Sequence, residues 1–417
     1  MKFRYGKIFL LGFGSFGFSM LWIIYNAFVP LFLEERFGLQ PGWIGFFMTL
    51  DNIAALVIQP SIGALSDRLR TPIGRRMPFI LMGAPVAALA FGLLPLTAAL
   101  PVFVACAGAL LLSMAFWRTP VVALMADVTP SRYRSQANGI TNFMGGLGAI
   151  LGTLGGSALY NVNPAYPFWM GAVAVVVAAL MVFFFVKEPA IPAPPDEEPG
   201  LWRSLQAIRK DADKSVGWIL TAMFAWLLAY SALEAFFSLY VKNHLGLPGS
   251  DGARLLGQFS LLLVICALPA GAIGGKIGRR KSLILGLLVI VPVFLIIYLL
   301  PPNVLTFTLT RLPVLGTVPV IGLLLMVLGS VWALVNVNVL PMILDMTDDA
   351  HIGTYTGLYY LSFTLAAVVG PNLNGWIVQF SGNNYAMIML ASLGFTLAAL
   401  VMMRGVRRGE AKTGAVV

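Results

Sequence analysis

The chain has 417 residues, of which 59% are hydrophobic and 11% are charged, and its mean hydropathy is +0.87. Soluble globular proteins carry about 25% charged residues, and folding hides only about three quarters of a chain of this size from water. The composition therefore excludes a soluble enzyme and a disordered chain, and the net charge of +10 indicates basic loops at a membrane surface rather than nucleic-acid binding.

Twelve runs of the sequence are long and apolar enough to cross a bilayer, since a spanning helix needs about 20 mostly apolar residues. In chain order they cover residues 8–33, 43–66, 77–98, 101–126, 138–160, 166–186, 216–241, 255–275, 282–300, 319–344, 353–380 and 385–403. The first run is too long for the core of a signal peptide, so we expect it to be retained. Membrane helices tolerate the prolines and glycines in these runs, and no strand alternation is sustained. The sequence therefore predicts an all-α membrane protein.

The basic residues predict the orientation of these helices, because cytoplasmic loops of membrane proteins carry an excess of lysine and arginine. If the N-terminus is cytoplasmic, the outer loops hold only Arg36, Lys242, Arg254 and Arg311 of the 27 basic residues. Arg118 lies inside the fourth run, and all the others lie on the inner side. We therefore expect both termini in the cytoplasm, and the compact loops favour a bacterial inner membrane.

The longest polar segment, 187–215, divides the chain into two sets of six helices. It begins with a proline-rich, acidic stretch, which is typical of a semi-rigid spacer. Residues 201–210 then alternate apolar and basic side chains, which predicts a short amphipathic helix on the cytoplasmic leaflet. The expected domains are a bundle over 1–186, the linker over 187–215 and a second bundle over 216–417.

The two halves of the chain repeat each other. Phe37-Gly38-Leu39 recurs as Leu245-Gly246-Leu247, and Asp127-Val128-Thr129 recurs as Asp345-Met346-Thr347. Parallel six-helix repeats with a site near the midplane are typical of transporters. Chance matches between glycine-rich helices are the alternative.

A charged motif follows the second run and recurs after the eighth. The first copy reads Gly63-Ala-Leu-Ser-Asp67-Arg68 and then Gly74-Arg75-Arg76, and the second ends in Gly278-Arg279-Arg280. This pattern resembles the cytoplasmic gating motif of the major facilitator superfamily, which implies that family's fold. The implied gate consists of Gly63, Asp67, Arg68, Gly74, Arg75, Arg76 and Asp127 in the first half and Lys276, Arg279, Arg280 and Asp345 in the second. A carboxylate at a helix end can bind an arginine and a neighbouring helix N-terminus; the alternative is basic loops without a gate.

Two stretches of the sequence resemble one particular group within this superfamily. Residues 59–80 and 120–140 are similar to the sucrose–proton symporters, within the glycoside-pentoside-hexuronide cation symporters. Sodium-coupled members of that group carry paired aspartates where this chain has Ala55 and Gln59. Because sodium requires several oxygen ligands, this difference favours proton coupling.

Three ionisable residues lie inside predicted spans: Asp51, Arg118 and Glu234. Such residues are costly in a bilayer and are therefore functional candidates. A carboxylate removed from water holds its proton at higher pH than in water, so we expect Glu234 or Asp51 to carry the proton. Arg118 is expected to clamp the substrate or to assist coupling. A static charge network is the alternative.

The family resemblance places the first, fourth, seventh and tenth helices around one cavity. The repeat spacing pairs Glu234 with Asn26 and Arg118 with Asn336 across these helices. Sugars stack on aromatic rings and bond to amides and charges. The candidate substrate-binding residues are Asn26, Arg118, Glu234, Asn336, Tyr25, Trp117, Tyr230, Trp332 and Tyr359.

The sequence thus predicts a monomeric secondary transporter that works by alternating access, as a proton-coupled symporter of a sugar or glycoside. A proton-coupled exporter of drugs or other amphipathic compounds is the first alternative, and an uncoupled facilitator or a receptor-like sensor are others. We expect no enzyme, cofactor or nucleic-acid partner. The two cysteines and two histidines have no spacing typical of a disulfide framework or a metal site.

Overall fold

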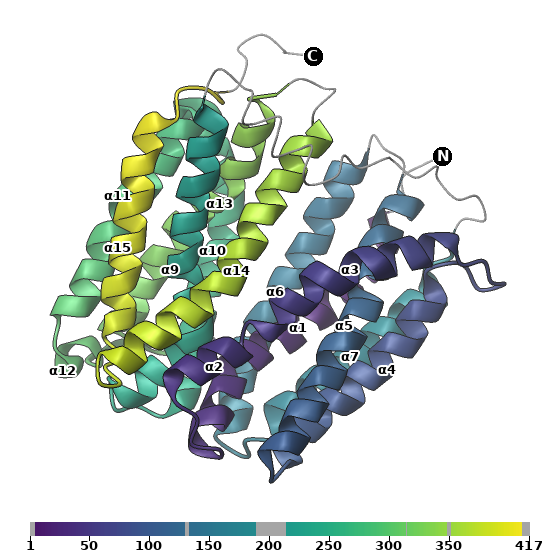
Figure 1. Ribbon diagram of the computed structural model, residues 1–417, viewed down its shortest axis with the longest axis horizontal. Helices are drawn as coiled ribbons and strands as arrows, with labels where there is room; N and C mark the ends of the chain where they lie inside the picture. Colours follow the sequence, from purple (N-terminus) through teal and green to yellow (C-terminus); the bar gives the residue numbers. More distant parts are fainter. Residues whose placement is uncertain (1–4, 130–132, 189–213, 314, 348–351, 411–417) are drawn as a thin grey trace. The chain divides into compact units, whose positions relative to one another are not determined.

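Figure 1 shows the computed structural model, which describes residues 5–129, 133–188, 214–313, 315–347 and 352–410. In this part of the chain, twelve helices are long and apolar enough to cross a membrane, which confirms the predicted number of spans. The predicted amphipathic helix within 201–210 lies outside the described residues.

The residues form two compact units. Unit 1 comprises Met1–Leu39, Leu50–Pro195 and Pro248–Gly257, and unit 2 comprises Gln40–Thr49, Asp196–Leu247 and Gln258–Val417. Unit 1 contains the helices α1 (Tyr5–Glu35), α3 (Leu50–Arg68), α4 (Met77–Leu93), η1 (Leu94–Leu96), α5 (Leu100–Val128), α6 (Arg134–Tyr160) and α7 (Tyr166–Phe185). Unit 2 contains α2 (Pro41–Phe47), α9 (Ser215–Asn243), α11 (Arg279–Leu299), α12 (Pro302–Leu305), β1 (Thr308–Leu312), β2 (Gly316–Pro319), α13 (Val320–Leu344), α14 (Ile352–Phe380), α15 (Met387–Met402) and η4 (Met403–Gly405). Helix α10 (Gly249–Ile277) begins in unit 1 and continues in unit 2.

Each unit includes a short segment from the other half of the sequence. These segments are Gln40–Thr49 and Pro248–Gly257, and the spacing that relates Phe37-Gly38-Leu39 to Leu245-Gly246-Leu247 also relates them to each other. The two segments that are grouped with the other half of the chain therefore occupy equivalent positions in the sequence repeat. The domain boundaries at 1–186 and 216–417 stay a prediction.

The repeated Gly-Leu pair ends a helix in the same way in both halves. Gly38 and Gly246 have φ angles of 64° and 69°, which is the left-handed region that glycine adopts without a steric penalty. The following residues close the turn, because the amide of Leu39 donates to the carbonyl of Leu33 and the amide of Leu247 donates to that of Val241. These bonds from the residue after the glycine back to the last helical turn cap the helix, as a left-handed glycine commonly does at helix ends.

The second predicted span is interrupted, contrary to the continuous run over 43–66. Helix α2 ends at Phe47, Met48 and Thr49 form a turn, and α3 begins at Leu50. The Thr49 hydroxyl donates to the carbonyl of Phe46 at 2.6 Å and helps to close this turn. An apolar run alone cannot reveal such a break, because all these residues suit a membrane helix.

Glycines allow the helices of each unit to pack closely. In unit 1, α6 lies against α1, and a Cβ atom on Gly148 would come 2.3 Å from the carbonyl oxygen of Phe16. In unit 2, α2 lies against α14, and a Cβ atom on Gly45 would come 2.3 Å from the carbonyl oxygen of Pro371. Small residues at such contacts are typical of membrane helix packing.

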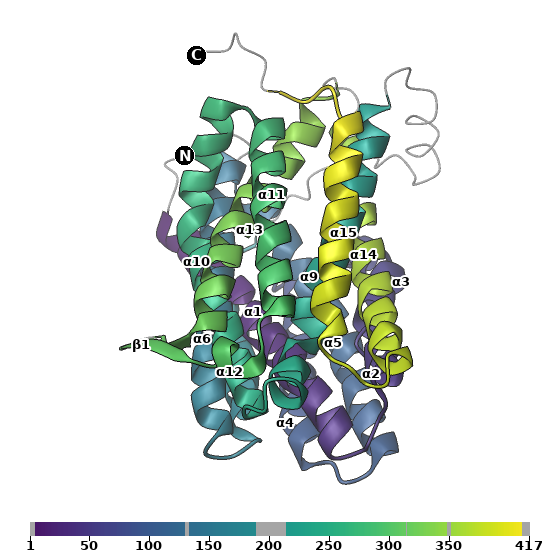
Figure 2. The same cartoon turned by 90° about the vertical axis from the view of Figure 1, so that its left-hand side faces the viewer.

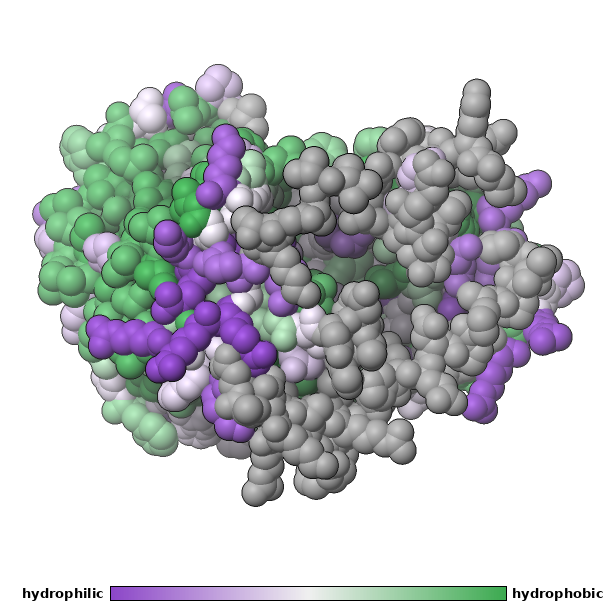
Figure 3. All heavy atoms as spheres, turned by 90° about the horizontal axis from the view of Figure 1, so that it is seen from above, coloured by the Kyte–Doolittle hydropathy of each residue, from purple (hydrophilic) through white to green (hydrophobic). Residues whose placement is uncertain are grey.

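The surface matches a membrane location. In the view of Figure 3, hydrophilic side chains gather on the helix ends that face the viewer, whereas hydrophobic side chains cover the flank of unit 2 at the left. Figure 2 shows one element that the sequence analysis did not predict, a two-stranded hairpin of β1 and β2 that projects sideways from the helices of unit 2.

Candidate functional site

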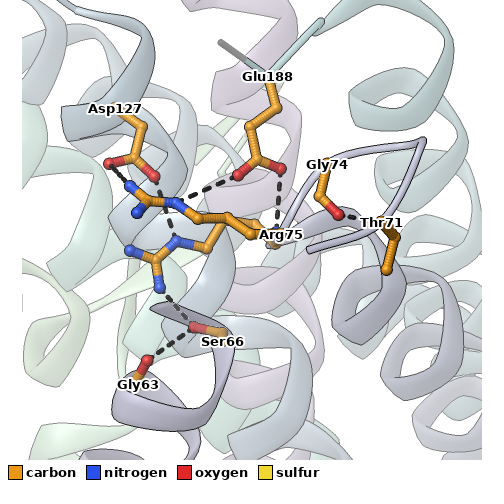
Figure 4. A network of polar contacts seen from close by, with 8 residues as sticks. Gly63, Ser66, Thr71, Gly74, Arg75, Asp127 and Glu188 are labelled. Carbon is orange, nitrogen blue, oxygen red and sulfur yellow. Dashed lines mark hydrogen bonds and ion pairs between the residues drawn. The ribbon is translucent and has the colours of Figure 1, made fainter. Parts of the chain in front are cut away.

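An ionic network joins three segments of unit 1 (Figure 4). Arg75 Nη2 lies 2.8 Å from Asp127 Oδ1, and Arg76 Nε lies 3.2 Å from Asp127 Oδ2. Asp127 is the penultimate residue of α5, and the two arginines directly precede α4. Arg76 also donates to the Ser66 hydroxyl of α3, which in turn donates to the carbonyl of Gly63. The network therefore ties together the ends of α3, α4 and α5.

Glu188 completes this network. One of its oxygens accepts from the backbone amide of Arg76 at 2.9 Å, and the other lies 3.4 Å from Arg75 Nε. The carboxylate thus lies at the N-terminus of α4, where the helix dipole stabilises negative charge. Gly74 makes room for it, because a Cβ atom there would lie 2.2 Å from Glu188 Oε2. Gly74 also has a φ angle of 112°, which other residues rarely adopt.

Unit 2 contains the same arrangement. Arg279, at the start of α11, pairs with Asp345, the residue that follows α13. The backbone amide of Arg279 donates to Glu410 Oε2 at 2.7 Å. Gly278 has a φ angle of 97°, and a Cβ atom there would lie 2.7 Å from Glu410. We call these two networks the unit 1 latch (Arg75, Arg76, Asp127, Glu188) and the unit 2 latch (Arg279, Asp345, Glu410).

The two latches differ in burial. In the unit 1 latch, the side chains of Arg75, Asp127 and Glu188 are 13%, 9% and 2% exposed. In the unit 2 latch, Arg279 and Asp345 are 22% and 30% exposed, and one arginine instead of two contacts the aspartate. Removal of a carboxylate is therefore more costly in unit 1, because buried charges without partners are expensive.

The predicted gate residues are only partly brought together. Arg75, Arg76, Asp127, Arg279 and Asp345 take part in the latches. Arg68 and Lys276 are exposed, and the side chain of Asp67 lies outside the described residues. Arg280 is half-buried, and its Nε atom has no hydrogen-bond partner in the described part of the chain.

Sequence reasoning missed Glu188 and Glu410. Both are acidic residues that follow the last helix of a half, shortly after α7 and after η4. Their equivalent places in the repeat were a usable signal. Glu188 belongs to the polar segment 187–215, whose composition indicates a linker and not a contact with a helix end.

Asp51 lies in the first turn of α3, directly after the interruption of the second span. Its side chain is buried, and Asn52 Nδ2 donates to both of its carboxylate oxygens, at 2.9 and 2.8 Å. The N-terminus of a helix favours negative charge. A discontinuous membrane helix next to an ionisable residue is a common feature of transporter ion sites.

Arg118 lies beside an aromatic row on α1. Its guanidinium carbon is 4.2 Å from the centroid of the Phe18 ring. Phe18 stacks on Trp22 with ring centroids 6.0 Å apart, and Trp22 stacks on Tyr25 at 5.4 Å. This row places one charged group and three flat rings along neighbouring faces of α5 and α1. Arg118 is exposed, whereas Tyr25 is fully buried.

Unit 2 contains a second aromatic cluster. Tyr230 of α9 stacks on Trp332 of α13 with ring centroids 5.3 Å apart, and Phe259 of α10 lies 6.4 Å from Tyr230. Glu234 follows Tyr230 by one helical turn and is half-buried. The structure therefore brings together three predicted residues, Tyr230, Glu234 and Trp332, on α9 and α13 of unit 2.

The other predicted substrate residues are more scattered. Asn26 is buried in α1, next to Tyr25, and Asn336 is half-buried in α13, one turn after Trp332. Trp117 is fully buried and turned toward α4, since a Cβ atom on Gly83 would lie 2.9 Å from its Cβ. Tyr359 lies on α14, and its ring packs edge-on against that of Tyr360.

No group of three His, Cys, Asp or Glu side chains in the described residues could hold a metal ion. The charged and aromatic groups described above are the candidate functional groups of these units. They can bind a solute by stacking and hydrogen bonding, and carboxylates can take up and release protons.

Comparison with known proteins identifies relatives. A family model described as Major Facilitator Superfamily matches residues 11–318 and 259–415. The class B tetracycline resistance protein of Escherichia coli is 25% identical over 88% of this chain and 90% of its own length. A sucrose transport protein of Oryza sativa subsp. japonica is 26% identical over 39% of this chain and 34% of its own length. The crystal structure of a bacterial homologue of the human lysosomal transporter Spinster superposes with a TM-score of 0.74, at 12% identity over 96% of both chains.

Proposed function

The chain belongs to the Major Facilitator Superfamily, and we propose that within this family it is a proton-coupled secondary transporter of a sugar or glycoside. Its relatives and fold are those of integral membrane transporters, which move solutes and do not transform them. Family membership does not determine the direction of transport, the solute or the coupling ion, and these are what we propose.

The placement of ionisable residues within the spans carries the proposal. Asp51 and Arg118 lie within spans of unit 1, and Glu234 lies within a span of unit 2. A charged side chain in a bilayer costs about 2.5–3.5 kcal/mol or more, so its presence needs a compensating role. Glu234 and Asp51 are the proposed proton carriers, and Arg118 is the proposed substrate clamp.

The aromatic groups support a sugar-like solute. Each unit has flat rings next to an ionisable residue, with Phe18 and Trp22 near Arg118, and Tyr230 and Trp332 near Glu234. A pyranose ring can stack its apolar face on such a ring while its hydroxyls bond to charged groups. In addition, Trp332 Nε1 is buried without a hydrogen-bond partner among the described residues. A solute hydroxyl would satisfy this donor.

The latches give alternating access a physical basis. Each latch joins the ends of helices within its own unit. We propose that they keep each unit rigid at the cytoplasmic face, so that transport proceeds by movement of whole units. The distribution of lysine and arginine supports the cytoplasmic position.

Export of drugs or other amphipathic compounds is the second candidate. The tetracycline resistance protein aligns with most of this chain, whereas the sucrose transport protein aligns with a shorter part. Aromatic rings and a buried acid suit an amphipathic cation or a planar drug as well as a sugar. The two candidates require opposite directions of net flux when the proton gradient points inward.

Uptake into proteoliposomes tests the proposal. Labelled sucrose and maltose are offered with an inward proton gradient, with and without a protonophore, and with tetracycline as a parallel substrate. We expect sugar accumulation that the protonophore abolishes and that Glu234→Gln lacks. Glu35→Gln, which changes an exposed acid at the end of α1, is the matched control and should retain uptake. Extrusion of tetracycline without uptake of either sugar would replace the symport proposal with export.

A further inference from the structure

The segment between α11 and α13 is unusually apolar for a loop. Residues 301–319 contain Arg311 as their single charged residue. Their apolar side chains include Val304, Phe307, Leu309 and Leu312. Loops that face water are normally polar, because exposed apolar runs favour association. This segment therefore does not have the composition of a solvated connection.

The segment has a defined structure. Strands β1 and β2 pair antiparallel, with Arg311 opposite Thr317 and Leu312 opposite Gly316. Gln258 of α10 is fully buried and its Nε2 atom donates to the carbonyls of Leu315 at 3.0 Å and Thr317 at 2.9 Å. These bonds fix β2 to the helices of unit 2. The hairpin is thus held in place and presents its outer strand in one orientation.

The outer strand is exposed along its full length. Each residue of β1 is exposed, whereas Val318 of β2 is buried. Phe307 is 65% exposed and Leu309 is 48% exposed. The described residues of the chain leave these apolar side chains uncovered. Figure 2 shows that the hairpin points sideways, away from the helices of unit 2, instead of continuing along their axes.

The exposed residues of the hairpin continue the apolar surface of the adjacent helices. Leu295 and Leu299 near the end of α11 are 39% and 65% exposed, and Leu323 at the start of α13 is 47% exposed. These side chains belong to helices long and apolar enough to cross a membrane, so we expect them to face lipid tails. The hairpin lies between the end of α11 and the start of α13, so its apolar strand begins where these apolar helix surfaces end.

We propose that β1 and Phe307 lie in the lipid headgroup layer, at the end of the helices opposite the unit 2 latch. The apolar side chains of Phe307 and Leu309 enter the upper part of the lipid tails, and the Arg311 guanidinium binds lipid phosphate. The strand stays in the interfacial layer, because an unpaired strand edge cannot satisfy its backbone groups in the hydrocarbon core. Water and lipid carbonyl groups supply those partners at the interface. Arginine suits phosphate, with which it forms two parallel hydrogen bonds.

Site-specific fluorescence in vesicles tests this placement. The half-buried Cys106 and Cys266 are first replaced by serine, and an environment-sensitive probe is attached to Leu309→Cys in the full-length protein. Leu295→Cys gives the lipid reference, and Asn383→Cys, in an exposed loop, gives the water reference. We expect brominated lipids to quench the probes at 309 and 295, and aqueous iodide to quench the probe at 383.

Two results would overturn the placement. Quenching of the 309 probe by iodide, to the same degree as at 383, would mean that the hairpin faces water. Protection from both quenchers, together with energy transfer between labelled copies, would mean that a second copy of the chain covers it. Neither result bears on transport, so this test is separate from that of the proposed function.

The role of Arg311 has its own test. In vesicles that contain phosphatidylglycerol, bromolipid quenching at position 309 should exceed that in phosphatidylcholine vesicles. Arg311→Gln should remove this difference, and Arg311→Lys should retain it. An unchanged difference in Arg311→Gln would exclude the phosphate contact. Equal thermal unfolding midpoints of the variants check that the fold is intact.

Discussion

Replacement of Asp127 by asparagine should destabilise the protein far more than the equivalent change at Asp345. Asp127 contacts two arginines, at 2.8 and 3.2 Å, and its side chain is 9% exposed. Asp127→Asn leaves Arg75 and Arg76 with Glu188 as the remaining acid of the latch. Loss of one partner from a buried ion pair costs about 3–5 kcal/mol. We expect about 3 kcal/mol here, since Glu188 still compensates part of the charge.

Asp345→Asn is the matched comparison. Arg279 and Asp345 are 22% and 30% exposed, so solvent weakens their attraction. Exposed pairs contribute about 0.2–1 kcal/mol. We therefore expect a loss of about 1 kcal/mol, which is markedly smaller than that for Asp127→Asn.

The free energy of unfolding can be measured for both variants in mixed micelles with increasing SDS. A double-mutant cycle of Asp127→Asn with Arg75→Gln isolates the pair, and the double variant should lose less than the sum of the single variants, because neither charge is left alone. Equal losses at Asp127 and Asp345, or additive losses in the cycle, would refute the assignment of the buried latch to unit 1.

Three further predictions follow from local geometry. Gly74→Ala should lower the thermal unfolding midpoint, because it combines a strained φ angle with a Cβ atom 2.2 Å from Glu188 Oε2; an unchanged midpoint would contradict this. Gly45→Ala should separate α2 from α14, since the new Cβ atom would lie 2.3 Å from the carbonyl oxygen of Pro371, and a cysteine cross-link between these helices should then form more slowly than in the parent. Burial lowers the pKa of His244, so the unfolded chain takes up a proton at higher pH than the folded one, and stability should fall as pH drops below about 6.5 and level off below the folded pKa. His244→Gln should flatten this part of the pH profile of the unfolding midpoint, and an unchanged profile would assign the effect to other groups.

The sequence predicts the helices well because a bilayer imposes a simple rule on them. Twenty apolar residues in a row have few other stable forms in a membrane, so the spans of both halves follow from composition. The turns at Gly38 and Gly246 follow from glycine's access to positive φ angles. The break at Met48 and Thr49 does not follow, because residues 46–50 contain no charge, glycine or proline that would mark a helix end.

The site is less predictable than the fold, because its contacts join residues far apart in the sequence. The motif that follows the second span indicates that Arg75 and Arg76 are important, but the sequence does not reveal that Glu188 binds the start of α4. The position of Arg118 over the Phe18 ring also depends on how α5 packs beside α1. The roles of Asp51, Arg118 and Glu234 in transport stay predictions.

The most direct test of proton coupling is the pH change that solute entry causes inside proteoliposomes. Purified protein is reconstituted with a trapped pH-sensitive dye, and sucrose, maltose or tetracycline is added outside at equal internal and external pH. A symporter brings protons in with the solute, and an antiporter expels them, whichever way the protein is inserted. We expect the lumen to acidify when the sugar is added and to remain unchanged in Glu234→Gln. Alkalinisation would establish exchange and contradict symport, and transport of the solute without a pH change would contradict proton coupling.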